Sequence, residues 1–306
     1  MQRDAITRVG ILRGGVGEDY ASSLRHGGDI ILHINDNLSD KYKTLDILID
    51  KDGVWHLNGL PINPSDLQNK IDIAWNTTHP NFSHTLESLS IPNVGRGIFS
   101  SSLENSREML REHMKKVGVN MPRHLVIPLY QKDFDGPRER YSIKKAKEVH
   151  QKFPAPWIIK SFTPDATMGI HLAKTFNELV GAIEDGVNHE KSILVEEFIS
   201  GKVASLHSVP HFRGQEIYNF PLGNTFGQFT DQEKEKLNAL VRNLHDHLGI
   251  SHYMKSDFVM NLRGKVYLLN IELSPDLRAD SHFSQVCDLV GAKPHHIIDH
   301  IIDRIS

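Results

Sequence analysis

Strand and helix signals alternate along the first hundred residues of this chain. The runs Thr7–Leu12, Thr44–Ile49 and Lys70–Trp75 are short and apolar, as buried strands are. A helical pattern over Tyr20–Asn35 lies between the first two runs. Strands that alternate with helices in this way predict a doubly wound parallel sheet.

The pattern changes after residues 95–102, where the stretch GRGIFSSS marks a boundary. An amphipathic helix is predicted over Leu103–Val117, and it ends at Gly118, a residue type that favours helix C-termini. Helices and antiparallel-looking strands then follow in runs. We therefore expect an α/β and α+β fold class, with an N-terminal doubly wound parallel-sheet domain followed by an α+β unit.

Composition and charge exclude several classes of protein. The chain has 306 residues, and its net charge of −3 comes without a dominant Lys/Arg cluster, so no nucleic-acid partner is expected. Cys287 is the only cysteine, which excludes an intrachain disulfide and fits a reducing compartment. No stretch approaches the roughly 20 apolar residues that span a bilayer. We expect a soluble, cytoplasmic protein with no membrane partner.

The stretch Tyr253–Ser281 predicts a hairpin that carries metal ligands. Asp257 lies on the first strand, a turn follows at Asn261–Gly264, and Asn270 and Glu272 lie on the returning strand. Side chains two residues apart on a strand share a face, so Asn270 and Glu272 point the same way. Two carboxylates and an amide oxygen form a hard oxygen site suited to Mg²⁺. The alternative interpretation is a surface hairpin with ordinary polar residues.

Four weaker features accompany the hairpin. The glycine turn Gly14–Gly17 after the first strand could accept an anion, although such turns also serve as plain connections. Lys160 ends the buried run PWIIKS, where a lysine can bind phosphate or lie on the surface. A loop ending in Gly169 could cover phosphates, and ILVEEFISG joins an apolar strand to acidic residues.

The order of these features resembles the ATP-grasp superfamily, and within it the D-alanine–D-alanine ligase family. RVGILRGG, PWIIKS, ILVEEFISG, SDFVM and NIELSPDLRADS follow in the family's order over nearly the whole chain. The resemblance implies an N-terminal α/β domain at residues 1–100, a central ATP-grasp lobe at 101–195 and a C-terminal lobe with the metal site at 196–306. It further implies an ADP-forming carboxylate–amine ligase that uses ATP with Mg²⁺ or Mn²⁺ and acts through an acyl phosphate. Amino acids or short peptides would be the substrates, and a homodimer the assembly.

The resemblance also implies roles for individual residues. Lys255 falls where the family has an arginine beside the reacting phosphoryl group, and Arg278 adds a guanidinium that can grip a carboxylate. The other implied contacts are Lys160 and Arg107 with phosphates, Leu194, Val195, Glu196 and Phe198 with adenine, Asp257, Asn270 and Glu272 with metal, and Gly15, His79 and Ser281 with substrate.

Several positions depart from the family pattern. The metal motif reads Asn-x-Glu instead of Glu-x-Asn, which preserves the ligand types. Ala21 aligns with the family's glutamate at the substrate amino group, Ala166 with a loop serine and Val203 with the acid at the ribose. Because a buried ammonium needs a carboxylate partner, we expect changed or lost acceptor chemistry unless Glu18 or Asp19 substitutes.

Two other functions stay open beside the ligase. A nucleotide-binding relative without turnover, with a sensing or partner role, is favoured by the replaced positions. A dehydrogenase is disfavoured because the glycine fingerprint is incomplete. Metal binding by His296 and His300 is disfavoured because no fixed pattern of further ligands accompanies them.

Overall fold

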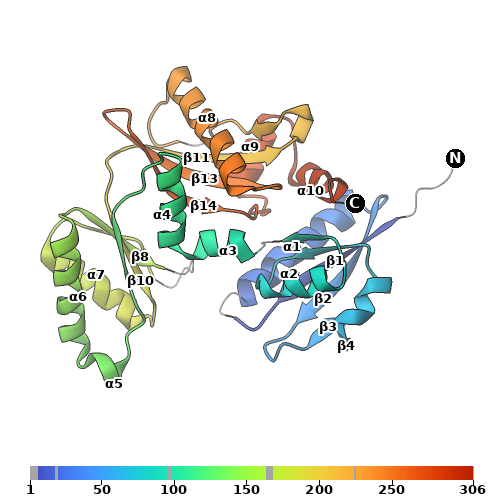
Figure 1. Ribbon diagram of the computed structural model, residues 1–306, viewed down its shortest axis with the longest axis horizontal. Coiled ribbons are helices and arrows are strands. Elements are labelled where there is room, and N and C mark those ends of the chain that lie inside the picture. Colours follow the sequence, from blue (N-terminus) through green and yellow to red (C-terminus); the bar gives the residue numbers. More distant parts are fainter. Residues whose placement is uncertain (1–5, 18–19, 96–97, 163–167, 224, 306) are drawn as a thin grey trace. The chain divides into compact units, whose positions relative to one another are not determined.

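The computed structural model describes residues 6–17, 20–95, 98–162, 168–223 and 225–305. The chain forms two compact units (Figure 1). The first comprises Met1–His113, Ala204–Asp257 and Asn270–Ser306, and the second comprises Met114–Val203 and Phe258–Leu269. The chain therefore passes from one unit to the other within strands of the C-terminal sheet.

The N-terminal sheet confirms the predicted parallel arrangement. Its strands run in the order β4-β3-β2-β1-β5-β6, and β1 pairs in parallel with both β2 and β5. At one edge β2, β3 and β4 pair antiparallel. The strand bounds are β1 (Thr7–Gly14), β2 (Tyr42–Ile49), β3 (Trp55–Leu57), β4 (Leu60–Pro61), β5 (Ile73–Asn76) and β6 (Asn93–Gly95).

The helices of this region are α1 (Tyr20–Asn37), η1 (Pro64–Asn69), α2 (Asn81–Ser88), α3 (Ile98–Asn105) and α4 (Arg107–Lys116). The prediction of one helix over Leu103–Val117 is wrong, because α3 and α4 are separate. Ser106 lies between them, and its hydroxyl accepts the Met109 backbone N–H at 3.2 Å. A serine that caps a new helix in this way favours a break over a continuous helix.

The second unit contains an antiparallel sheet with strand order β7-β10-β8-β9. Its core includes Tyr141, Trp157 and Ile159, and α6 and α7 lie side by side against it (Figure 1). The bounds are β7 (His124–Ile127), β8 (Trp157–Ser161), β9 (His171–Ala173), β10 (Ile193–Glu197), α5 (Lys132–Asp135), α6 (Arg138–Lys152) and α7 (Phe176–Asn188).

The C-terminal sheet has the order β12-β11-β13-β14 and carries the predicted hairpin as β13 and β14. In the first unit α10 lies beside α1 (Figure 1), and Ile297 and Ile301 of α10 share a core with Ile30 of α1. The bounds are β11 (Gly201–Pro210), η2 (Phe212–Gly214), β12 (Ile217–Asn219), α8 (Asp231–Leu248), β13 (Met254–Asn261), β14 (Val266–Glu272), α9 (His282–Leu289) and α10 (Pro294–Asp303).

Among the described residues, no helix combines the length and the apolar sequence that crossing a bilayer requires.

Candidate active site

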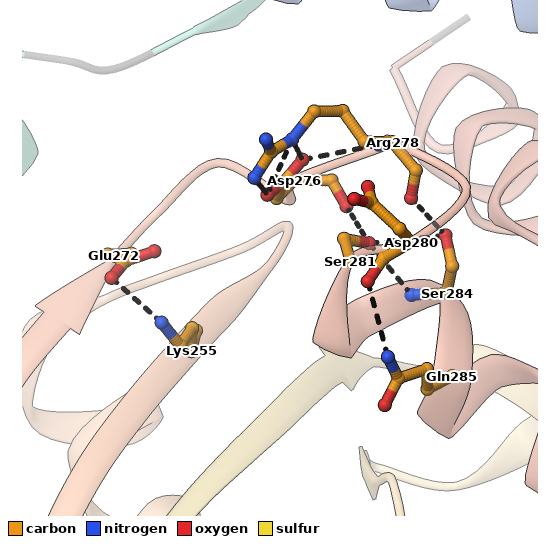
Figure 2. Close-up of polar contacts among 8 residues, drawn as sticks. All are labelled: Lys255, Glu272, Asp276, Arg278, Asp280, Ser281, Ser284 and Gln285. Carbon is orange, nitrogen blue, oxygen red and sulfur yellow. Dashed lines mark hydrogen bonds and ion pairs between the residues drawn. The ribbon is translucent and has the colours of Figure 1, made fainter. Parts of the chain in front are cut away.

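The hairpin of β13 and β14 brings three charged side chains together. Lys255 and Asp257 share a face of β13, because they are two residues apart. Lys255 Nζ lies 2.9 Å from Glu272 Oε1 on β14 and 3.6 Å from Asp257 Oδ2 (Figure 2 shows the Lys255–Glu272 pair). Asn270 shares the face of Glu272 by the same alternation. The structure therefore places the predicted metal ligands on one face of the sheet, with Lys255 among them.

The turn at Asn261 fixes this hairpin. Asn261 Oδ1 accepts the backbone N–H groups of Arg263 and Lys265, each at 3.0 Å. Gly264 has a φ of 71°, a conformation that glycine adopts without steric cost. The asparagine and glycine that predicted the turn are thus the residues that form it.

Electrostatics keep the Lys255 ammonium charged. Burial alone would lower the pKa of Lys255, but Asp257 and Glu272 outweigh burial and raise that pKa above its usual value. Ser205 of β11 donates a hydrogen bond of 2.5 Å to Asp257 Oδ1, which orients that carboxylate. A permanent positive charge therefore lies where two negative side chains converge.

The donor set fits a hard divalent cation. The Lys255 ammonium is a cation that both carboxylates already reach, at 2.9 and 3.6 Å. Within the part of the chain that the structure describes, no group of three or more His, Cys, Asp or Glu side chains could hold a metal ion. The sequence predicts the Asn270 amide as the third oxygen donor, and carboxylate and amide oxygens are what Mg²⁺ prefers.

Lys160 is held in the second unit by a buried acid. Its Nζ lies 2.9 Å from Glu196 Oε2, and the Glu196 side chain is only 6% exposed. Lys160 on β8 pairs with Leu194 on the neighbouring strand β10. Val195 points to the opposite face and joins the core, so only its backbone remains for a ligand. Phe198 follows β10 and is exposed.

The segment after β14 holds its own polar network (Figure 2). Arg278 donates two hydrogen bonds to the Asp276 carboxylate, from Nη2 to Oδ2 at 2.6 Å and from Nε to Oδ1 at 2.9 Å. This pairing, with burial opposing it, lowers the pKa of Asp276. Ser281 Oγ donates to the Asp276 carbonyl at 2.8 Å and accepts the Ser284 N–H at 3.1 Å, which caps α9. Arg278 and Ser281 are therefore engaged within the chain.

The remaining site residues lie in the first unit. Gly15 has a φ of 109° and lies beside Thr78, the neighbour of His79. His79 is exposed, and its Nδ1 accepts the Asn81 N–H at 3.3 Å. Arg107 begins α4 and is buried. The suggested substitutes Glu18 and Asp19, and the loop residue Ala166, lie outside the described residues.

Two groups near the hairpin were not predicted from the sequence. Ser205 binds Asp257, and His207 forms hydrogen bonds with Tyr253 and His282. The period-two spacing of Ser205 and His207 on a predicted strand is the signal that could have identified them.

Known proteins with similar sequences match nearly the whole chain. It matches no protein-family model. It is 23% identical to a D-alanine–D-alanine ligase of Carboxydothermus hydrogenoformans, covering 96% of this chain and 97% of the relative. It is 24% identical to a D-alanine–D-alanine ligase of Geobacter sulfurreducens, and the match covers 94% of this chain and 90% of that ligase.

Solved structures agree with these relatives. The VanG D-Ala:D-Ser ligase of Enterococcus faecalis has a TM-score of 0.74 at 16% identity, covering 99% of this chain and 100% of that one. A D-alanine–D-alanine ligase of Bacillus anthracis complexed with ATP has a TM-score of 0.68 at 18% identity, covering 98% and 97%. The chain therefore has the fold of these ligase structures, and its similarity to the D-alanine–D-alanine ligases extends over nearly their whole length.

Proposed function

We propose that this chain is an ATP- and Mg²⁺-dependent carboxylate–amine ligase that forms ADP. The names of its relatives and the ATP complex of one solved relative support this proposal. The single observation that carries it is the convergence of Asp257 and Glu272 on the Lys255 ammonium, because a phosphoryl-transfer site needs both metal ligands and a fixed cation.

The proposed reaction has two steps. A carboxylate oxygen of the first substrate attacks the γ-phosphorus of ATP, and ADP leaves. An amine nitrogen then attacks the acyl carbon, and phosphate leaves with one oxygen of the original carboxylate. Lys255 would hold its charge beside the transferring group, since its raised pKa keeps it protonated. Asp257, Asn270 and Glu272 would hold Mg²⁺ or Mn²⁺, which would offset phosphate charge when bound.

The proposed amino-acid substrate differs from D-alanine. Ala21 is exposed on α1 and offers no carboxylate for a substrate ammonium. The Asp276 carboxylate is already paired with Arg278. A substrate ammonium without an acidic partner is strongly disfavoured in a closed site. Efficient formation of D-alanyl-D-alanine by the purified protein would contradict this part of the proposal.

Calorimetric titration with Mg-ATP tests the nucleotide site. We expect binding that requires Mg²⁺ and that weakens on the order of 10-fold or more in Lys160→Ala, because a phosphate loses a charged donor. Lys145→Ala is the matched control, since Lys145 is also an ion-paired lysine of the second unit, 3.0 Å from Glu148. Equal affinities for wild type, Lys160→Ala and Lys145→Ala would refute the assignment of Lys160.

Three further statements remain proposals. The family resemblance supports the homodimer and the division into domains 1–100, 101–195 and 196–306, and the single cysteine supports the cytoplasmic location.

A further inference from the structure

A chain of three polar side chains lies beside the Lys255 cluster, and the proposed chemistry does not use it. Tyr253 Oη is 2.6 Å from His207 Nδ1, and His207 Nε2 is 2.7 Å from His282 Nδ1. Tyr253 and His207 are almost completely buried, at 1% and 2% exposure. Polar groups buried in this way are retained only when they are paired.

Two of the three side chains lie next to the residues of the candidate site along the chain. His207 is two residues beyond Ser205 on β11, so the two share a face, and Ser205 binds Asp257. Tyr253 directly precedes β13, the strand that carries Lys255 and Asp257. Burial lowers the pKa of His282, and the nearby charge of Lys255 lowers it further, with Asp257 opposing. His282 therefore lies within the electrostatic reach of the Lys255 cluster.

The hydrogen bonds fix where the hydrogens lie. Among the described residues, His207 Nδ1 is the one hydrogen-bond partner of the Tyr253 hydroxyl, so the hydroxyl donates its hydrogen there. His207 is neutral, because burial and the neighbouring His282 and Lys255 lower its pKa to about 3. Its own hydrogen must then be on Nε2, which donates to His282 Nδ1. His282 consequently carries its hydrogen on Nε2.

His282 Nε2 is buried and has no hydrogen-bond partner in the described part of the chain. Gly223 lies directly over it, since a Cβ at that glycine would be 2.7 Å from Nε2. The chain of three side chains thus ends in an N–H donor that packs against Gly223 and has no acceptor among the described residues. An unsatisfied buried donor is costly, so a ligand oxygen that reached Nε2 would supply the missing hydrogen bond.

We propose that His282 Nε2–H is a specificity-determining donor to a carboxylate oxygen of the amino acid that this ligase binds, with His207 and Tyr253 as positioning residues. The inference rests on the proposed function and adds a substrate contact to it. A neutral N–H donor and the Lys255 ammonium both favour an anionic oxygen. The hydrogen bonds from Tyr253 to His207 and from His207 to His282 keep the hydrogen of His282 on Nε2, so that this atom donates and does not accept.

Long-range ¹H–¹⁵N spectra of the wild-type protein test the tautomers without any assay of activity. We expect the Nε2–H form for His207 and His282. His245 is the internal control with the opposite form, because its Nδ1 lies 3.0 Å from the Ile250 carbonyl, which can only accept a hydrogen. The Nδ1–H form at His282 would overturn the proposal.

The same spectra with added D-alanine, D-serine and acetate, in the presence of Mg²⁺ and a non-hydrolysable ATP analogue, test the contact itself. We expect the His282 Nε2–H signal to move with at least one of these probes. Its failure to move with all three overturns the proposal. Failure of Mg-ATP to bind in the calorimetric titration would instead remove the proposed function and leave the tautomer result intact.

Variants separate a substrate contact from a structural role. His282→Leu is expected to raise KM for the amino acid on the order of 10-fold to 100-fold with KM for ATP unchanged, and His282→Gln to restore part of the loss. Tyr253→Phe keeps the ring but removes the hydroxyl that donates to His207 Nδ1. The tautomer of His207 is then no longer fixed, so His282 should show mixed tautomers. Equal changes in both KM values would show a structural role and count against the proposal.

Discussion

At the scale of single residues, Lys255 sets the charge balance of the candidate site. Two carboxylates within 3.6 Å of one ammonium leave a net charge of about −1, which attracts a divalent cation less strongly than two unpaired acids would. Lys255 therefore lowers the affinity of the site for a metal ion, and it supplies a fixed positive charge. That arrangement is useful where phosphate groups must be held together with a metal ion.

The order of Asn270 and Glu272 is predicted to be exchangeable. In the double variant Asn270→Glu with Glu272→Asn, both ligand types stay on one face, so Mg²⁺-dependent nucleotide affinity should stay within about threefold of wild type. Glu272→Gln removes a carboxylate and should weaken the Mg²⁺-dependent nucleotide affinity on the order of 10-fold or more. Isothermal titration at several Mg²⁺ concentrations measures both. Undiminished Mg²⁺ dependence in Glu272→Gln would show that Glu272 is no ligand.

Residue-level prediction from the sequence placed the candidate ligands on one face but missed their partners. Asp257, Asn270 and Glu272 could be placed there because strand alternation and a turn signal position them without knowledge of the fold. The pairing of Arg278 with Asp276 and of Lys160 with Glu196 depends on rotamers and on neighbouring strands. No spacing rule in the sequence contains that information.

At the scale of elements, close backbone approach constrains the C-terminal sheet. A Cβ at Gly201 of β11 would lie 2.1 Å from the Met260 carbonyl oxygen on β13. Only glycine therefore allows these two strands to meet at this point. Backbone cannot move aside as a flexible side chain can, so the two strands would have to separate.

Gly201→Ala should accordingly lower the free energy of unfolding by about 1–3 kcal/mol. Gly181→Ala is the matched control in the same unit, because a Cβ added to that exposed glycine of α7 would meet nothing within 4 Å. Gly181→Ala should raise the free energy of unfolding by about 0.5–1 kcal/mol. Urea unfolding of both variants measures the difference. A loss for Gly201→Ala no larger than the change in the control would contradict the account.

Element-level prediction succeeded where periodicity and turn chemistry agreed. The parallel N-terminal strands and the β13–β14 hairpin are confirmed. The single helix over Leu103–Val117 was wrong because the apolar period continues through Ser106, whereas the backbone breaks there for a helix cap. A serine in a helical pattern is compatible with both outcomes, and the surrounding packing decides between them.

At the scale of the whole molecule, buried neutral histidines concentrate in the first unit. His207, His245, His252 and His282 all have a pKa lowered from its usual value, in each case chiefly by burial. All four belong to Ala204–Asp257 or Asn270–Ser306. Folding therefore favours the neutral imidazoles, and the folded first unit binds fewer protons than its unfolded form below the usual histidine pKa.

This arrangement predicts acid lability of the first unit. Its stability should be fully present above about pH 6.5 and should fall as the pH is lowered, with His207 alone contributing up to about 1.4 kcal/mol per pH unit down to about pH 3. Amide hydrogen exchange, corrected for intrinsic rates, should show loss of protection in β11 and α8 as the pH falls. Peptides from β8 and β10 of the second unit are the reference. Protection in β11 and α8 that is independent of pH over this range would contradict the prediction.

The proposed ligase must make an acyl phosphate from a carboxylate and ATP. Mass analysis of the phosphate released from Mg-ATP, with a panel of amino acids labelled with ¹⁸O in their carboxylates, detects this intermediate. We expect one ¹⁸O atom from the active amino acid to appear in the phosphate, and Lys255→Met to abolish this transfer. Phosphate that carries no ¹⁸O, or nucleotide binding without phosphate release for any amino acid in the panel, would contradict it and favour a nucleotide-binding protein without ligase activity.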